Sequence, residues 1–158
     1  MVKSLSKFYI LDENLAIPIG DKNVSWDSSS QDWFYISEGV WFMQAGIIWD
    51  GATFVPDGKE SKTKKGYPEI WLATLIHDLG RYSLEEGDFP YTGSEIHCFF
   101  YEQMKAVKSP LALPYFIGVK LFGGIWESAY RRFLALTGTE RRFPSHVDDE
   151  NLTEWVSV

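Results

Sequence analysis

The stretch YPEIWLATLIHDLGRYSLEEGDFPYTGSEIHCFFYEQM, residues 67–104, decides the fold of this 158-residue chain. Large apolar residues recur in it at the three- and four-residue spacing of amphipathic helices, in two separate runs. The first helix should begin near Pro68 and end at Gly80, because proline suits a first helical turn and glycine a helix end. The second should begin at Ser94, a typical N-cap, with Glu95 in its first turn. We therefore expect two consecutive helices joined by a loop.

The chain before this stretch is typical of β structure. Short apolar runs at 7–11 and 15–19 predict one hairpin, and the runs at 32–36 and 40–44 predict another. The apolar run at 46–49 should form a further strand. The N-terminal third therefore predicts antiparallel hairpins or a small sheet.

After the two helices, a third helix is expected from Leu113 to Leu136. Its apolar stripe is Val119, Phe122, Trp126, Ala129, Tyr130 and Phe133. Strands first and helices after indicate an α+β fold, with three helices packed on one core. Residues 1–138 should form a single α+β domain, and the charged segment 139–158 a polar C-terminal tail.

Composition limits the possible functions. The formal net charge of −7 argues against nucleic acid as the main partner. No apolar run reaches the roughly 20 residues of a membrane span, and the N-terminus is not typical of a signal peptide, so we expect a chain that stays in the cytoplasm.

The many aromatic residues predict a core of large side chains or, alternatively, a binding surface or subunit interface. The lone cysteine, Cys98, should be buried beside Phe99 and Phe100.

The adjacent residues His77 and Asp78 are the strongest indication of chemistry. A histidine can act as a general base when a carboxylate orients its ring, so His77, Asp78 and Asp50 are candidate catalytic residues. His77, Asp78, His97 and Asp50 together would suit zinc with an open water position, and the Asp50-Gly51 turn could help to hold calcium. Equally, the histidine and aspartate could simply close hydrogen bonds at a helix edge.

A lysine-rich segment, 57–66, lies between the β region and the helices. It could be a mobile basic flap that meets an anionic group, or an ordinary solvated loop.

Four motifs occur in a characteristic order: W-D-G-A-T-x-V-P at 49–56, L-I-H-D-L-G at 75–80, F-Y-E-Q-M at 100–104 and V-K-L-F-G at 119–123. On these motifs the chain resembles the domain of unknown function 1353 family, found mainly in bacteriophages and prophages. The resemblance implies a phage origin, a location in the host cytoplasm during infection or in the virion, and no established activity.

One position departs from that family, which usually has aspartate where this chain has His97. If that acid normally orients the histidine, Glu95 or Asp50 must do so here, or the site has become a metal site or has decayed. A weaker similarity is to small phospholipases A2, and it implies that His77 would activate water and Asp78 would ligate calcium.

Three functions stay open. A small metal- or His-dependent hydrolase, acting on an unknown substrate, predicts side chains that converge in a hollow. A virion, tail or assembly accessory protein, which could be oligomeric and bind phage structural proteins, predicts an exposed apolar patch, for example around Trp26, Trp33, Trp41 or Trp155. An inhibitor of a host protein predicts an ordered acidic face.

Overall fold

The computed structural model describes residues 9–51, 59–64, 66–137, 144–147 and 155–157. The elements are β1 (Tyr9–Ile10), β2 (Asn14–Pro18), β3 (Trp26–Asp27), β4 (Phe34–Ser37), β5 (Val40–Met43), β6 (Ile47–Trp49), α1 (Trp71–Glu86), α2 (Gly93–Ala106), α3 (Ala112–Thr137), β7 (Ser145–His146) and β8 (Trp155–Ser157). The predicted α+β class is confirmed: the N-terminal strands β1 to β6 precede the helices, and β7 and β8 follow them.

The strands form two sheets. One has the order β3-β4-β5-β2-β8 and the other β1-β6-β7, and all pairings are antiparallel except that of β2 with β8. The hairpin predicted around residues 37–39 is confirmed, because β4 pairs with β5 and leaves Glu38 and Gly39 as a two-residue turn. Both turn residues have positive φ, as the common hairpin turns require.

The other predicted hairpin is wrong. β1 pairs with β6, whereas β2 pairs with β5, so residues 11–13 cross from one sheet to the other. The crossing buries Leu11 and Leu15 almost completely. Burial of these two side chains in a shared core therefore outweighs the local preference for a tight turn.

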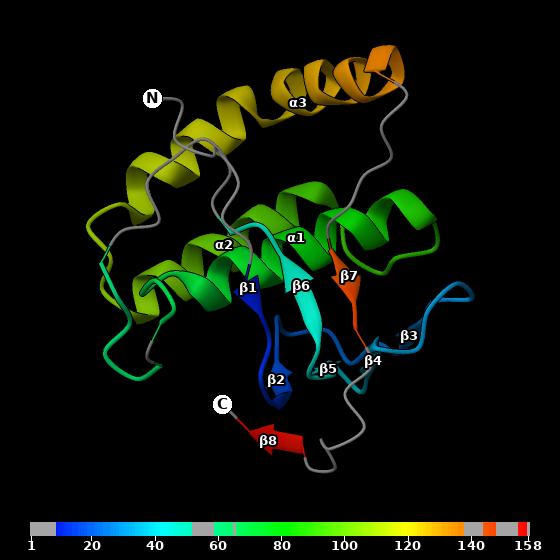
Figure 1. Cartoon of the computed structure of the whole chain (residues 1–158), viewed down its shortest axis with the longest axis vertical. Coiled ribbons are helices and arrows are strands. Elements are labelled where there is room, and N and C mark those ends of the chain that lie inside the picture. Colours follow the sequence, from blue (N-terminus) through cyan, green and yellow to red (C-terminus); the bar gives the residue numbers. More distant parts are fainter. Residues whose placement is uncertain (1–8, 52–58, 65, 138–143, 148–154, 158) are drawn as a thin grey trace.

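The helices form layers over the sheets (Figure 1). The main core lies between the sheets and α1, with contributions from α2, and its largest fully buried side chains include Trp41 and Trp49. A second cluster joins α1, α2 and the start of α3; its members are Ile70, Ala73, Phe100, Met104 and Ala112. α3 thus lies on the side of the helical layer that faces away from the sheets.

The bounds of the first two helices differ from the prediction. α1 continues through Gly80, because this glycine permits close packing rather than ending the helix: a Cβ there would lie 2.9 Å from Cγ2 of Ile96. α2 is capped by Thr92 and not by Ser94. The Thr92 hydroxyl accepts from the Glu95 amide at 3.2 Å, and the Glu95 carboxylate accepts from the Thr92 amide at 2.8 Å, which is a capping box.

Parts of the segment expected to be a tail, 139–158, join the sheets. β7 pairs with β6, and β8 adds a parallel strand to the edge of β2. Gly46 allows the first of these contacts, since its φ is 93° and a Cβ would lie 2.1 Å from the Val147 carbonyl oxygen. Two short pieces of the C-terminal segment therefore join different sheets, β7 the three-stranded one and β8 the five-stranded one.

Two single-residue predictions are wrong. Cys98 is exposed, because α2 buries Ile96, Phe100 and Met104, and position 98 faces the other way. Trp41 is fully buried and cannot belong to an exposed patch. In the described part of the chain, no helix combines the length and apolar character needed to cross a bilayer.

Candidate functional site

His77 lies where α1 contacts α2. Its imidazole ring stacks on that of His97, with centroids 5.6 Å apart and planes 20° apart, and it is 5.3 Å from the ring of Phe100. The sequence placed these two histidines twenty residues apart, and the packing of α1 on α2 brings them together. The pair is the part of the predicted site that the structure assembles.

Asp78 lies beside His77 on α1. One carboxylate oxygen, Oδ1, is 3.5 Å from Nδ1 of His77, close enough for electrostatic attraction when the imidazole is protonated. The side chains keep 25% and 17% of their surface exposed, but Nε2 of His77 and Oδ2 of Asp78 are themselves buried. The exposed part of the His77 ring therefore does not include Nε2, the nitrogen that does not face Asp78.

His97 is held in its neutral form. Burial, and after it the positive charges of Arg81 and Lys120, together lower the pKa of its imidazole to about 4. A neutral imidazole can ligate a metal, but two nearby cations oppose the approach of a divalent ion.

Asp50 follows the end of β6, as predicted, and Gly51 after it has a φ of 71°. The preceding residue, Trp49, donates from its indole nitrogen to Thr74 Oγ1 at 3.0 Å, which fixes this strand end against α1. Within the described ranges, no three His, Cys, Asp or Glu side chains are arranged to hold a metal ion. The four proposed metal ligands, Asp50, His77, Asp78 and His97, therefore do not form one metal-binding group.

Glu95, the other acid that could have oriented the histidine, is engaged elsewhere. Its carboxylate caps α2 and forms an ion pair with Lys22 at 2.6 Å. These contacts, with the Lys22 hydrogen bond the largest, lower the pKa of the Glu95 carboxyl. Its role in the structure is to fix the start of α2.

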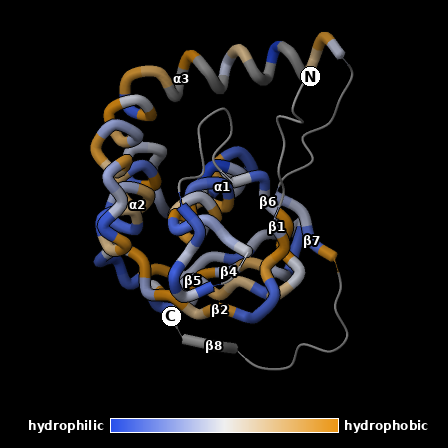
Figure 2. The backbone as a smooth tube through the Cα atoms, turned by 60° about the vertical axis from the view of Figure 1, so that its left-hand side comes forward, coloured by the Kyte–Doolittle hydropathy of each residue, from blue (hydrophilic) through white to orange (hydrophobic). Residues whose placement is uncertain are grey.

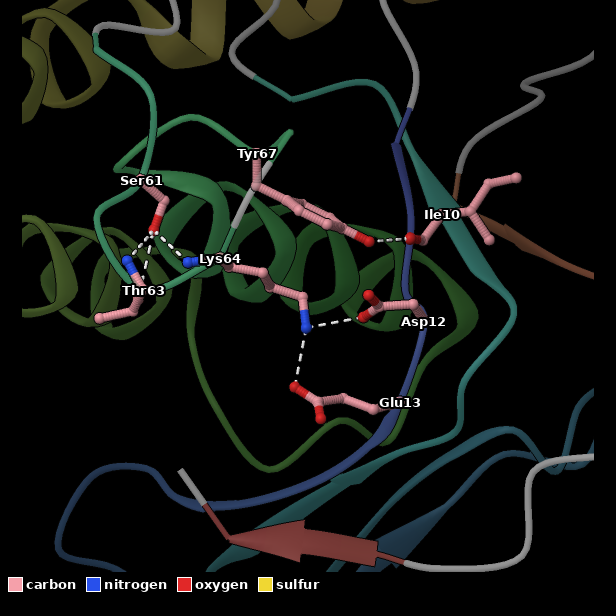
Figure 3. Close-up of polar contacts among 7 residues, drawn as sticks. All are labelled: Ile10, Asp12, Glu13, Ser61, Thr63, Lys64 and Tyr67. Carbon is pink, nitrogen blue, oxygen red and sulfur yellow. Dashed lines mark hydrogen bonds and ion pairs between the residues drawn. The ribbon is translucent and has the colours of Figure 1, made fainter.

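The lysine-rich segment is anchored at Lys64 (Figure 3). The Lys64 ammonium lies 2.6 Å from Asp12 Oδ1 and 2.7 Å from Glu13 Oε1, and it also sits over the rings of Tyr67 and Trp71. Burial alone would lower the pKa of Lys64, but the hydrogen bonds to the two carboxylates outweigh it and raise that pKa. The Tyr67 hydroxyl further ties the segment to the fold by donating to the carbonyl of Ile10.

The third histidine, His146, holds β7 in place. Its Nε2 lies 2.9 Å from the Ala45 carbonyl oxygen, and its ring stacks on Trp33 with 4° between the planes. Sequence reasoning assigned no role to this residue, since it lies in the segment expected to be a tail.

The outer face of α3 is the other feature that sequence reasoning missed. We give this name to six exposed side chains: Leu113, Ile117, Leu121, Phe122, Ile125 and Leu136. The predicted buried stripe included Phe122 and Ala129, yet both are exposed. The signal was present as apolar residues at 113, 117, 121 and 125, a four-residue spacing that marks a second apolar side of the same helix.

Comparison with known proteins gave no match: no family model, no curated protein and no solved structure is similar to this chain.

Proposed function

We propose that this chain is an accessory subunit of a larger assembly, acting through protein contacts rather than catalysis. A phage particle or one of its assembly intermediates is the setting suggested by the motifs described above. The observation that carries the proposal is the outer face of α3, whose six large apolar side chains are 47% to 87% exposed.

Water contact at this face is costly. A fully exposed side chain of this kind presents roughly 100 Å² of apolar surface. Because each of the six is only partly exposed, together they present roughly 400 Å². Five of these side chains lie within residues 113–125, and clustered exposed apolar side chains are often binding sites. A helix that is apolar on two sides normally lies between two partners. Among the described residues, the start of α3 packs on α1 and α2, and Figure 2 shows α3 at the outside of the helical layer with hydrophobic (orange) positions along it.

The arrangement around His77 also supports a non-catalytic role. Its Nε2 is buried in the contact between α1 and α2, and its ring packs on Phe100. A general base must reach the proton it removes, and a nitrogen without exposed surface is poorly placed to do so. The histidine pair therefore fits a helix contact better than a reaction centre.

The test uses the phage or prophage that encodes the chain. Ile125→Lys places a charge on the outer face of α3, whereas Val107→Lys places one on an apolar residue exposed at the end of α2. Mass spectrometry of purified particles and assembly intermediates should detect the wild-type chain and the Val107 variant, and lose the Ile125 variant. Equal incorporation of both variants, or absence of the wild-type chain from every particle and intermediate, would refute the proposal.

A second candidate, the small hydrolase, is favoured by one observation. Arg81 and Lys120 place positive charge near the paired imidazoles, as their effect on the pKa of His97 indicates, and this charge would attract an anionic ester. In this role His77 would be the base and Asp78 the group that orients it.

Chromogenic phosphodiesters and carboxylic esters provide the test of this alternative. His77→Ala should abolish hydrolysis while His146→Ala, outside the pair, retains it. If the wild-type protein hydrolyses none of them, or if His77→Ala lowers only the melting temperature, the histidine is structural. Native mass spectrometry of the purified protein would show whether zinc or calcium is bound.

A further inference from the structure

We propose that Arg81, His97 and Lys120 bind a phosphate group where α2 packs on α1 and α3. This inference goes beyond the assembly role and beyond the hydrolase alternative, since it needs neither a partner protein nor a reaction. Each of the three helices supplies one of the three side chains.

Arg81 is partly buried without an acidic partner. Among the described lysine and arginine side chains, only Lys64 and Arg81 are half-buried. Lys64 meets two carboxylates, whereas Arg81 has no hydrogen bond or ion pair with any residue that the structure describes. The acid nearest in sequence on this helix, Asp78, faces His77 instead. A charge partly removed from water normally has an anionic partner that replaces its lost hydration, so the Arg81 guanidinium is available to an external anion.

Gly93 allows the guanidinium to lie close to α2. A Cβ at this position would be only 3.0 Å from Nη1 of Arg81. Gly93 and His97 are one turn apart on α2, as His77 and Arg81 are on α1. The close approach of Arg81 to Gly93 therefore lies one turn from the stacked rings of His77 and His97. Arg81 thus borders the side of α2 that carries His97.

Lys120 reaches His97 from α3. The rings of Phe116 and Tyr101 pack together, with centroids 4.6 Å apart, and the Lys120 ammonium lies 5.0 Å from the centroid of Phe116. Lys120 is one turn beyond Phe116 on α3, and His97 is one turn before Tyr101 on α2. The positive charges of Arg81 and Lys120 both act to lower the pKa of His97, which supports a position of both cations near its ring.

The three donors match a phosphate group better than a carboxylate. A guanidinium donates two parallel hydrogen bonds to an oxyanion, an ammonium adds a second positive charge, and a neutral imidazole donates one N–H. A phosphate group carries about two negative charges near pH 7 and three acceptor oxygens. A carboxylate has a single charge, so it would pair with Arg81 and leave Lys120 without a counter-charge. The same two cations oppose a divalent metal ion.

Titration with inorganic phosphate provides the first test. Isotope-labelled protein at pH 7 and constant ionic strength should show saturable shifts of the NMR signals of the Gly93 and His97 amides and of the Arg81 side-chain N–H. Three charge-assisted donors at a partly exposed position predict a dissociation constant of about millimolar. Shifts that do not saturate by about 50 mM phosphate, or that centre on another part of the molecule, would overturn the inference.

Variants test the assigned residues. Arg81→Gln should weaken phosphate binding by about tenfold or more, and Lys120→Gln, at an exposed position where folding is unaffected, by about three- to tenfold. Arg81→Lys keeps the charge but loses the fork, so it should bind between the wild type and Arg81→Gln. Arg132→Gln, an exposed arginine farther along α3, is the matched control and should bind as the wild type does. Equal losses at Arg81 and Arg132 would mean general attraction to positive charge and would overturn the site.

Two further ligands distinguish the sources of the phosphate group. Glycerol 3-phosphate should bind at least as tightly as inorganic phosphate if the natural ligand is a free monoester. Sedimentation of the chain with phosphatidic acid vesicles, but not with phosphatidylcholine vesicles, and its loss in Arg81→Gln would identify a lipid headgroup instead. Binding of inorganic phosphate alone would restrict the ligand to the free ion.

These outcomes are independent of the assembly role, which is tested at Ile125 on the outer face of α3. Loss of Ile125→Lys from particles without phosphate binding would leave the assembly role standing and this inference wrong. Phosphate binding by a chain that is absent from every particle and intermediate would give the reverse result. Phosphate binding without hydrolysis of any ester would establish a binding site and exclude the tested hydrolase activity.

Discussion

Gly80 of α1 faces Ile96 of α2 across a contact that leaves no room for a side chain, since an added Cβ would lie 2.9 Å from Cγ2 of the isoleucine. The same helix contact stacks His77 on His97. The glycine therefore sets the distance at which the two histidines meet.

Gly80→Ala should lower the free energy of unfolding by about 1–3 kcal/mol, because overpacking displaces α2. Gly118→Ala is the matched control, since Gly118 also lies within a helix but has no atom within 4 Å of an added Cβ. The control should gain about 0.5–1 kcal/mol from the higher helix propensity of alanine. Urea unfolding of both variants checks the opposite signs, and two changes of the same sign would contradict the packing described.

His97 should make stability depend on pH. Its pKa is about 4 in the folded protein, below the ordinary value of 6.5, so between these limits the unfolded chain binds a proton that the folded chain does not. Stability should therefore fall as the pH is lowered from about 6.5 to about 4 and change no further through this group below that. Chemical unfolding at pH 7 and pH 5 should show a smaller loss for His97→Gln than for the wild type. An equal loss in both would place the pKa of His97 near its ordinary value.

Lys64→Met should destabilise the fold by about 1–2 kcal/mol. The substitution leaves Asp12 and Glu13 facing each other without their shared cation, although the exposure of both acids moderates the cost. Lys59→Met, at an exposed position in the same segment, should change stability by less than about 0.5 kcal/mol. Thermal unfolding at low and high salt measures the difference, which should shrink as salt screens the two acids.

Gly46→Ala should release β7 while the helices stay folded. The glycine has a φ of 93° and lies against the Val147 carbonyl, so a methyl group there strains the turn and collides with the incoming strand. Hydrogen exchange followed by mass spectrometry should show faster exchange at residues 145–147, with exchange in α1 unchanged. Uniformly faster exchange would mean that β7 and the core unfold together.

The sequence predicted those features that depend on local pattern. The α+β order, the turn at Glu38-Gly39 and the third helix follow from strand alternation, turn residues and helical spacing. The bounds of α1 and α2 were missed because Gly80 serves a contact between helices, which no local rule reveals. The capping residue could have been found, since Thr92 and Glu95 have the spacing of a capping box.

The candidate site was only partly predictable for the same reason. The sequence suggested that His77 and His97 would approach, and the packing of two consecutive helices produces that contact. It also suggested that Asp50 would join them as a metal ligand, which depended on the path of β6 relative to α1. The outer face of α3 was overlooked because one apolar stripe was taken to account for the whole helix.

The pairing of β8 with β2 joins Trp155 to Asn14, residues separated by almost the whole chain. One edge of β2 pairs with β5, and the other pairs with β8. Until residue 155 has been synthesised, that second edge has no partner strand from β8. A nascent chain held at that stage would offer an open strand to chaperones or to other nascent chains. Slow translation of the codons before residue 155 would therefore lengthen the period in which this protein can aggregate.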